Sequence, residues 1–150
     1  MKQRGGDYLA KFLDLRTSQN ASYSNSIAQP ITVAGAPQLF GRIGLGTVGA
    51  GPNIRVLLQG AVSLQLPLLP AVTTITIQVV RGTSPNSPLV YSASENMDLN
   101  ILGPQTFAFN ALDFNPPADI QQTYSAYISV SLVGVVRVGP ESFSGVAVSD

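Results

Sequence analysis

Residues 53–66 alternate between apolar and polar side chains, and this alternation constrains the fold more than any other feature of the sequence. The apolar side chains fall on even positions, whereas Arg55, Gln59 and Ser63 fall on odd positions. Successive side chains of a strand point to opposite faces, so the stretch predicts one long strand with one buried face. A helix would spread the same residues around its circumference. Gly60 interrupts the even positions, which predicts a bulge or the close approach of another segment.

The sequence after residue 30 continues as strands separated by turns rich in Pro and Gly. Residues 73–80 alternate in the same way, and residues 124–138 form a second long pattern that is interrupted by Gly134. Shorter strands are predicted at residues 31–33, 39–48, 89–93, 107–111 and 143–148. About eight antiparallel strands without a helix predict an all-β sandwich or barrel. Eight strands suit a jelly-roll β-sandwich, although an immunoglobulin-like sandwich gives a similar string of strands.

Residues 1–30 differ in character from the rest of the chain. Four of the eight basic residues lie in the first 16 positions, and residues 17–26 are rich in Ser and Asn. Residues 8–15 are mainly apolar and fit either a helix or a strand. We therefore expect an N-terminal arm and linker over residues 1–30 and a β-sandwich domain over residues 31–150. The arm either packs on its own domain or docks on a neighbouring subunit by adding a strand or filling a groove.

The sequence carries unusually little charge. Hydrophobic residues make up 45% of the chain and charged residues 11%, against about 25% charged in typical soluble domains. The formal net charge is zero, so no net repulsion opposes self-association. The absence of a basic cluster argues against nucleic acid as a partner, and no apolar run approaches the roughly 20 residues of a membrane helix. We expect the chain to bind copies of itself, as a homo-oligomer or polymer.

Two groups of apolar residues are candidates for the contact between subunits. One group lies in the arm, and the other falls on strand positions that should face solvent. The predicted interface residues are Tyr8, Leu9, Phe12, Leu13, Leu15, Leu57, Tyr127, Val133 and Val135.

The sequence offers little for catalysis or cofactor binding. It contains no His and no Cys, which excludes an imidazole base, a thiol nucleophile and a disulfide. Residues 44–49 spell GxGxxG, but Pro52 and a strand follow where a dinucleotide site needs a helix. Asp113 and Asp119 are interpreted as turn residues rather than as calcium ligands. We predict no enzyme activity, no catalytic, cofactor-binding or metal-binding residue, and no cofactor.

Two resemblances add expectations about assembly. The final stretch, ESFSGVAVSD at residues 141–150, resembles the closing strand of C1q/TNF-like jelly-roll domains. The polar N-terminal segment, the Pro- and Gly-rich turns and the low charge resemble subunits of bacterial endospore surfaces, the exosporium and the spore appendages. That resemblance implies assembly into a fibre or surface layer through the N-terminal segment, an extracellular place on the spore surface, and other surface-layer proteins as partners. Without Cys, such a fibre is held non-covalently.

Two other functions remain open at this point. A C1q/TNF-like domain would be a compact trimeric head that binds a protein or glycan partner. A viral capsid subunit would also combine a jelly roll with an N-terminal arm, but capsid arms that face a genome are more basic than residues 1–16.

Overall fold

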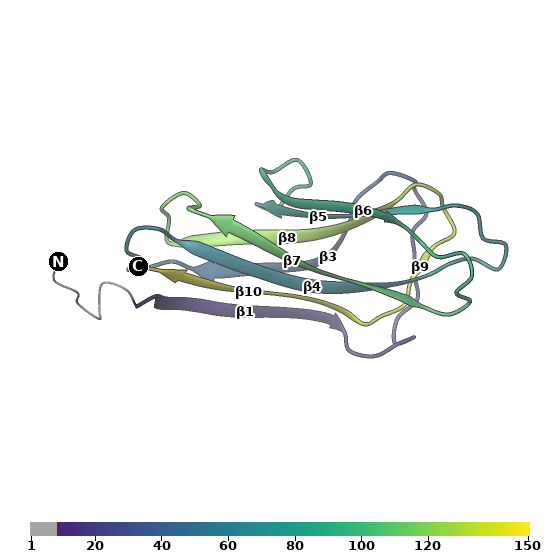
Figure 1. Ribbon diagram of the computed structural model, residues 1–150, viewed down its shortest axis with the longest axis horizontal. Helices are drawn as coiled ribbons and strands as arrows, with labels where there is room; N and C mark the ends of the chain where they lie inside the picture. The colour runs from purple at the N-terminus through teal and green to yellow at the C-terminus, as the bar shows by residue number, and fades with distance from the viewer. Residues whose placement is uncertain (1–8) are drawn as a thin grey trace.

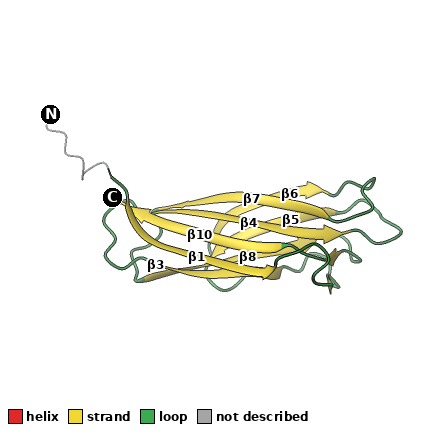
Figure 2. Cartoon of the chain, turned by 90° about the horizontal axis from the view of Figure 1, so that it is seen from below, coloured by secondary structure: helices red, strands yellow, loops and turns green. Residues whose placement is uncertain are grey.

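The computed structural model describes residues 9–150, which fold into strands and loops without a helix (Figures 1 and 2). No helix of the length and hydropathy needed to cross a bilayer occurs in this range. The strands are β1 (Lys11–Ala21), β2 (Gln29–Pro30), β3 (Gln38–Gly46), β4 (Arg55–Gln65), β5 (Thr74–Arg81), β6 (Leu89–Asn96), β7 (Gln105–Phe114), β8 (Gln121–Val130), β9 (Val136–Arg137) and β10 (Glu141–Ser149).

The strands form two antiparallel sheets. The first sheet has the order β1-β10-β4-β7, and the short strands β9 and β2 extend it at the far end of β4. The second sheet has the order β3-β8-β5-β6. The chain crosses between the sheets repeatedly, and the last long strand lies between the first strand and β4, as in a jelly roll. The prediction of an all-β jelly-roll sandwich is confirmed.

The alternation in residues 53–66 corresponds to β4, whose even positions face the core. Leu58, Val62 and Leu64 are fully buried there. Gly60 marks a close approach, as its missing side chain predicted: a Cβ atom at this position would lie 2.6 Å from the ring of Phe109 and 2.7 Å from the carbonyl oxygen of Ser142. Such a contact is shorter than van der Waals packing allows, so this position of β4 requires glycine.

Residues 11–21 form the strand β1 of the sandwich, so this part of the predicted arm over residues 1–30 packs on its own domain, which is one of the two alternatives that the sequence left open. The strand β1 pairs with β10 along its whole length, from Lys11 opposite Ser149 to Ala21 opposite Glu141. A register shift between Phe12 and Asp14 inserts Leu13 as an extra residue. The Ser- and Asn-rich composition that suggested a linker suits an edge strand, because most side chains of such a strand meet solvent.

The predicted strand over residues 124–138 is two strands joined by a loop. The first, β8, ends at Val130, and β9 covers only Val136 and Arg137. Gly134 lies in the loop with φ of +107°, a conformation that L-residues rarely adopt. The alternation of apolar residues on even positions therefore continued through the loop, where no strand exists. Leu132, which this alternation placed on the buried face, lies in the loop and is 44% exposed.

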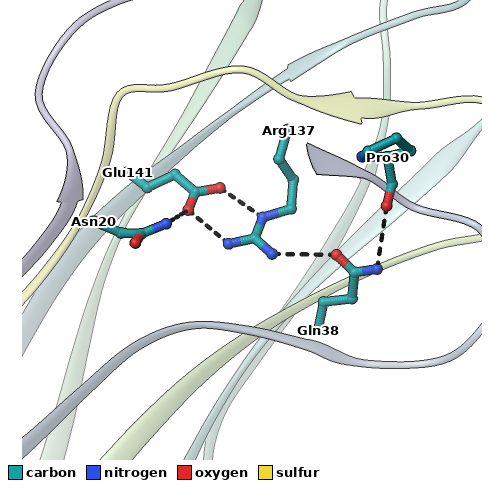
Figure 3. A network of polar contacts seen from close by, with 5 residues as sticks. All are labelled: Asn20, Pro30, Gln38, Arg137 and Glu141. Carbon is teal, nitrogen blue, oxygen red and sulfur yellow. Dashed lines mark hydrogen bonds and ion pairs between the residues drawn. The ribbon is translucent and has the colours of Figure 1, made fainter. Parts of the chain in front are cut away.

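A buried ion pair holds one end of the first sheet together (Figure 3). The guanidinium of Arg137 donates two hydrogen bonds to the carboxylate of Glu141, at 2.7 and 2.6 Å. Asn20 of β1 donates to the same carboxylate at 2.8 Å, and Arg137 also donates to Gln38 of β3 at 3.2 Å. The network therefore links β1, β3, β9 and β10, and its central pair is screened from solvent because Glu141 is fully buried.

A second polar network joins the two sheets. Arg81 of β5 donates to both carboxylate oxygens of Asp113 on β7, at 2.9 and 2.7 Å. The buried hydroxyl of Tyr124 on β8 donates to Asp113 at 2.6 Å. Burial, followed by the neighbouring Asp113, raises the pKa of Tyr124, so the phenol stays protonated and can donate. Asp113 is thus a structural anchor rather than the turn residue that the sequence suggested.

We expect β1 to loosen from β3 in acid. The carboxylate of Asp14 accepts hydrogen bonds from the backbone N–H of Gly46 at 2.8 Å and from Arg16 at 2.9 Å. The hydrogen bond from Gly46 has the largest effect, and together these donors hold the pKa of Asp14 below its ordinary value of 3.8. A carboxyl with a lowered folded-state pKa contributes stability above its unfolded pKa and loses it as the pH falls through the folded value. In thermal unfolding, Asp14→Asn should melt below the unmodified protein at pH 6, and the gap should narrow at pH 3. A gap that is independent of pH would contradict this role.

Candidate assembly surface

Two rows of outward-facing side chains cross the first sheet near the start of β4. The strand register aligns these side chains on the face that points away from the second sheet. The first row is Leu15, Val146, Leu57 and Leu112, and the second is Phe12, Val148, Arg55 and Phe114. Neighbouring strands are about 4.8 Å apart, so each row is a nearly continuous band of side chains across β1, β10, β4 and β7. We call these eight residues the apolar face.

The apolar face is open to solvent. Leu112 is 73% exposed, Phe114 64%, Phe12 63% and Leu15 57%. Between β10 and β7 the side chains border a groove of about 320 Å³, with Leu57 at its base. Exposed apolar side chains are common singly, but aligned rows across a whole sheet mark a binding surface.

The one charged member of the apolar face is already neutralised within the subunit. Arg55 donates to the carboxylate of Asp150 at 2.8 Å, and Asn53 donates to the same carboxylate at 2.7 Å. Both donors lower the pKa of Asp150, and the hydrogen bond from Asn53 has the larger effect. The ion pair of Arg55 and Asp150 therefore stays charged at neutral pH. A partner surface therefore needs no opposite charge in order to cover Arg55.

The row next to the apolar face is polar, which gives the apolar face a boundary on that side. The next row along the strands is Thr17, Ser144, Gln59 and Asn110. Its polar side chains bond one another, as Gln59 donates to Asn110 at 3.0 Å. An apolar centre with a polar rim is the usual anatomy of a protein–protein interface.

The structure brings three predicted interface residues together. Phe12, Leu15 and Leu57 belong to the apolar face, and Leu9 is 68% exposed just before β1. Leu13 turns the other way at the register shift and packs, partly buried, against the core. Tyr8 lies outside the described residues.

The other three predicted interface residues are not part of this surface. Two of them, Tyr127 and Val135, are buried, in contrast to the solvent-facing positions expected from the sequence. Tyr127 is 4% exposed and Val135 is 1% exposed. The hydroxyl of Tyr127 lies beneath the β5–β6 loop, where it donates to the carbonyl of Thr83 at 3.2 Å. Both side chains are covered within the subunit, so neither can reach a neighbour. Val133 is 57% exposed but lies in the β8–β9 loop at the far end of the sandwich.

The sequence did not predict five of the eight residues of the apolar face, which are Arg55, Leu112, Phe114, Val146 and Val148. Leu112 and Phe114 fall on the even positions of β7, opposite the core-facing Phe107 and Phe109. Val146 and Val148 alternate in the same way with buried Ala147 in β10. The available signal was an apolar outer face at the end of each strand, and in β10 the positions 146–148 are apolar on both faces, so that strand needs cover on its outer side too.

Within residues 9–150, neither a dinucleotide site nor a metal site is found. Residues 44–49 form the end of β3 and a turn, without the helix that a dinucleotide site needs. Across residues 9–150, no cluster of three or more Asp or Glu side chains is placed to hold a metal ion.

Comparison with known proteins bears on the fold alone. No protein-family model and no curated protein matches the chain. Among solved structures, dimeric latent PorU from Porphyromonas gingivalis is similar at 11% identity with a TM-score of 0.51, over 93% of this chain and 13% of PorU. A chain of the T13 IBDV viral particle is similar at 12% identity with a TM-score of 0.46, over 91% of this chain and 35% of that chain. The chain thus spans a small part of each of these larger proteins, and the likeness to PorU concerns the fold alone.

Proposed function

We propose that the protein is a structural subunit without enzyme activity, which self-assembles non-covalently into a fibre or surface layer. The contact is the apolar face, covered by another copy of the same chain. The observation that carries this proposal is the alignment of two exposed apolar rows across all four long strands of the first sheet. The N-terminal segment takes part through Phe12 and Leu15 while β1 remains paired with its own β10.

A second copy is the occupant that the charge pattern favours. The apolar face carries no unpaired charge, so it gives a charged protein or nucleic acid nothing to recognise. The chain as a whole has zero formal net charge, and two copies therefore meet without net repulsion. Glycan-binding sites need convergent polar groups, and the groove over Leu57 offers almost none.

The apolar face would be the centre of a larger contact. A standard interface covers about 800 Å² per partner, which is about a tenth of the 8137 Å² surface of this chain. Burial of apolar surface contributes about 25 cal/mol per Å², and the exposed leucines and phenylalanines of the apolar face supply the centre of such a contact. Leu9 and the polar row beside Gln59 would form its rim.

A charge placed in the middle of the apolar face should abolish assembly. Leu112→Asp adds an unpaired carboxylate next to Leu57, and a central interface residue typically contributes about 2 kcal/mol or more, so association should weaken at least about 30-fold. Because Leu112 is 73% exposed, the isolated subunit should keep its fold. Sedimentation velocity and negative-stain microscopy measure the effect.

The matched control is Ala108→Asp, which adds the same charge on the same strand and face, opposite Ala61 and beyond the polar row. The proposal expects Ala108→Asp to assemble like the unmodified protein. Equal loss of assembly in both variants, or none in Leu112→Asp, would overturn it. Micrographs also distinguish a fibre or sheet from a closed trimer or shell.

A further inference from the structure

A second exposed apolar surface lies at the end of the sandwich away from the apolar face. Leu68 and Leu69 in the β4–β5 loop are 101% and 90% exposed, and Leu102 in the β6–β7 loop is 88% exposed. Leu132 and Val133 of the β8–β9 loop are also exposed. We call these five residues the loop tip. Leucines at this degree of exposure make no contribution to the fold of their own subunit.

The three loops of the loop tip are held next to one another. The side chain of Gln65 donates to the carbonyl of Leu102. The backbone N–H of Thr74 donates to the hydroxyl of Ser131 at 2.8 Å, and Gly134 lies against Pro67. The exposed leucines therefore project from a braced platform rather than from independent loops.

The loop tip carries no charged residue, and the apolar face carries only Arg55, which is paired within the subunit. Residues 66–73, 99–104 and 131–135 contain no Lys, Arg, Asp or Glu. They also contain no Trp, Tyr or Phe, whereas surfaces that bind a membrane interface rely on aromatic and basic side chains. The chemistry favours an uncharged apolar groove as the partner.

The two surfaces lie at opposite ends of the same strand. Arg55 at the start of β4 belongs to the apolar face, and the loop tip begins directly after Gln65 at the end of β4. In Figure 1 the β4–β5 loop lies at the right-hand end of the molecule and the C terminus at the left. One surface projects, the other is grooved, and they are too far apart to meet within a subunit.

We infer that Leu68 and Leu69 of one copy occupy the groove of the next copy, over Leu57 and between Leu112 and Val146. This inference rests on the proposed self-assembly and specifies its geometry. The contact joins two different surfaces, so it is heterologous, and repeated contacts of this kind grow an open filament unless the rotation closes a ring. A contact of the apolar face with itself would instead stop at a dimer.

Mixing two variants tests the inference. The tip variant carries Leu68→Asp and Leu69→Asp, and the groove variant carries Leu112→Asp. Each alone should remain monomeric, because one half of every contact is missing. Mixed in equal amounts, they should form a one-to-one dimer and nothing larger, since the intact loop tip of the groove variant can enter the intact groove of the tip variant. Mass photometry or sedimentation velocity measures the masses.

The outcomes separate the inference from the proposed function. If the tip variant assembles like the unmodified protein, or if the mixture stays monomeric, the head-to-tail contact is overturned, although loss of assembly by Leu112→Asp would still support the apolar face. If the unmodified protein does not associate, the proposed function itself fails. Tyr23→Asp is the control, because Tyr23 is 75% exposed in the β1–β2 loop outside both surfaces, and it should assemble normally.

Discussion

Arg137→Met should lower the free energy of unfolding by about 3–5 kcal/mol, the usual cost of leaving a buried ion without its partner. The carboxylate of Glu141 is fully buried and would keep only the hydrogen bond from Asn20. The loss should also loosen the end of β1, because the network of Figure 3 joins β1 to β10. Chemical denaturation measures the change in free energy.

The double substitution Arg137→Met with Glu141→Met is the informative companion. Replacing both ions by apolar side chains removes the uncompensated charge, so the double variant should be more stable than Arg137→Met alone. By contrast, Arg16→Ala should cost no more than about 1 kcal/mol, because the guanidinium that pairs with Asp14 is 61% exposed. A double variant as unstable as Arg137→Met would contradict the claim that the uncompensated charge of Glu141 causes the loss of stability.

Phe109→Ala should also cost about 3–5 kcal/mol, the usual range for truncating a buried aromatic side chain. The ring of Phe109 stacks on Tyr91 with the centroids 5.7 Å apart, and it meets Phe40 and Phe143 at 6.2 Å. It therefore joins β7 to strands of both sheets. Thermal and chemical unfolding of the purified variant measure the loss.

A double-mutant cycle with Gly60 tests the same contact from the other side. Gly60→Ala alone should destabilise the fold by about 1–3 kcal/mol, because the new methyl group would lie 2.6 Å from the ring of Phe109. Phe109→Ala removes the clash of the methyl group with the ring and leaves its 2.7 Å contact with the carbonyl oxygen of Ser142. The double variant should therefore lose less than the sum of the two single losses, although it keeps part of the cost of Gly60→Ala. Strict additivity would show that the two positions do not share this space.

Local alternation predicted the strands well where one face is buried. The pattern of residues 53–66 gave β4 and its glycine, and residues 73–80 gave β5 almost to the residue. The same pattern misled at residues 124–138, because alternation cannot reveal a turn at Gly134. It left residues 8–15 open between a helix and a strand, and it did not predict the second half of β1, whose edge position permits a polar composition that resembles a linker.

The apolar face was only partly predictable for a different reason. Phe12 and Leu15 stood out as apolar residues of the predicted arm, and Leu57 as an apolar residue on an expected solvent position. Their alignment with Leu112 depends on strand register, which follows from the sheet order. Tyr127 occupied an equivalent position in the sequence and is buried, because the β5–β6 loop covers it. Which outer face receives such cover is decided by tertiary structure, not by the periodicity of one strand.

Sedimentation velocity of the unmodified protein over a range of concentrations tests the central claim most directly. The protein should grow from monomer into large species as its concentration rises. Added sulfate should favour the large species, since excluded salts strengthen apolar burial, whereas a contact made of exposed ion pairs would weaken with salt. A protein that sediments as a monomer at the highest concentration, with and without sulfate, would contradict the claim that the apolar face joins one copy to the next.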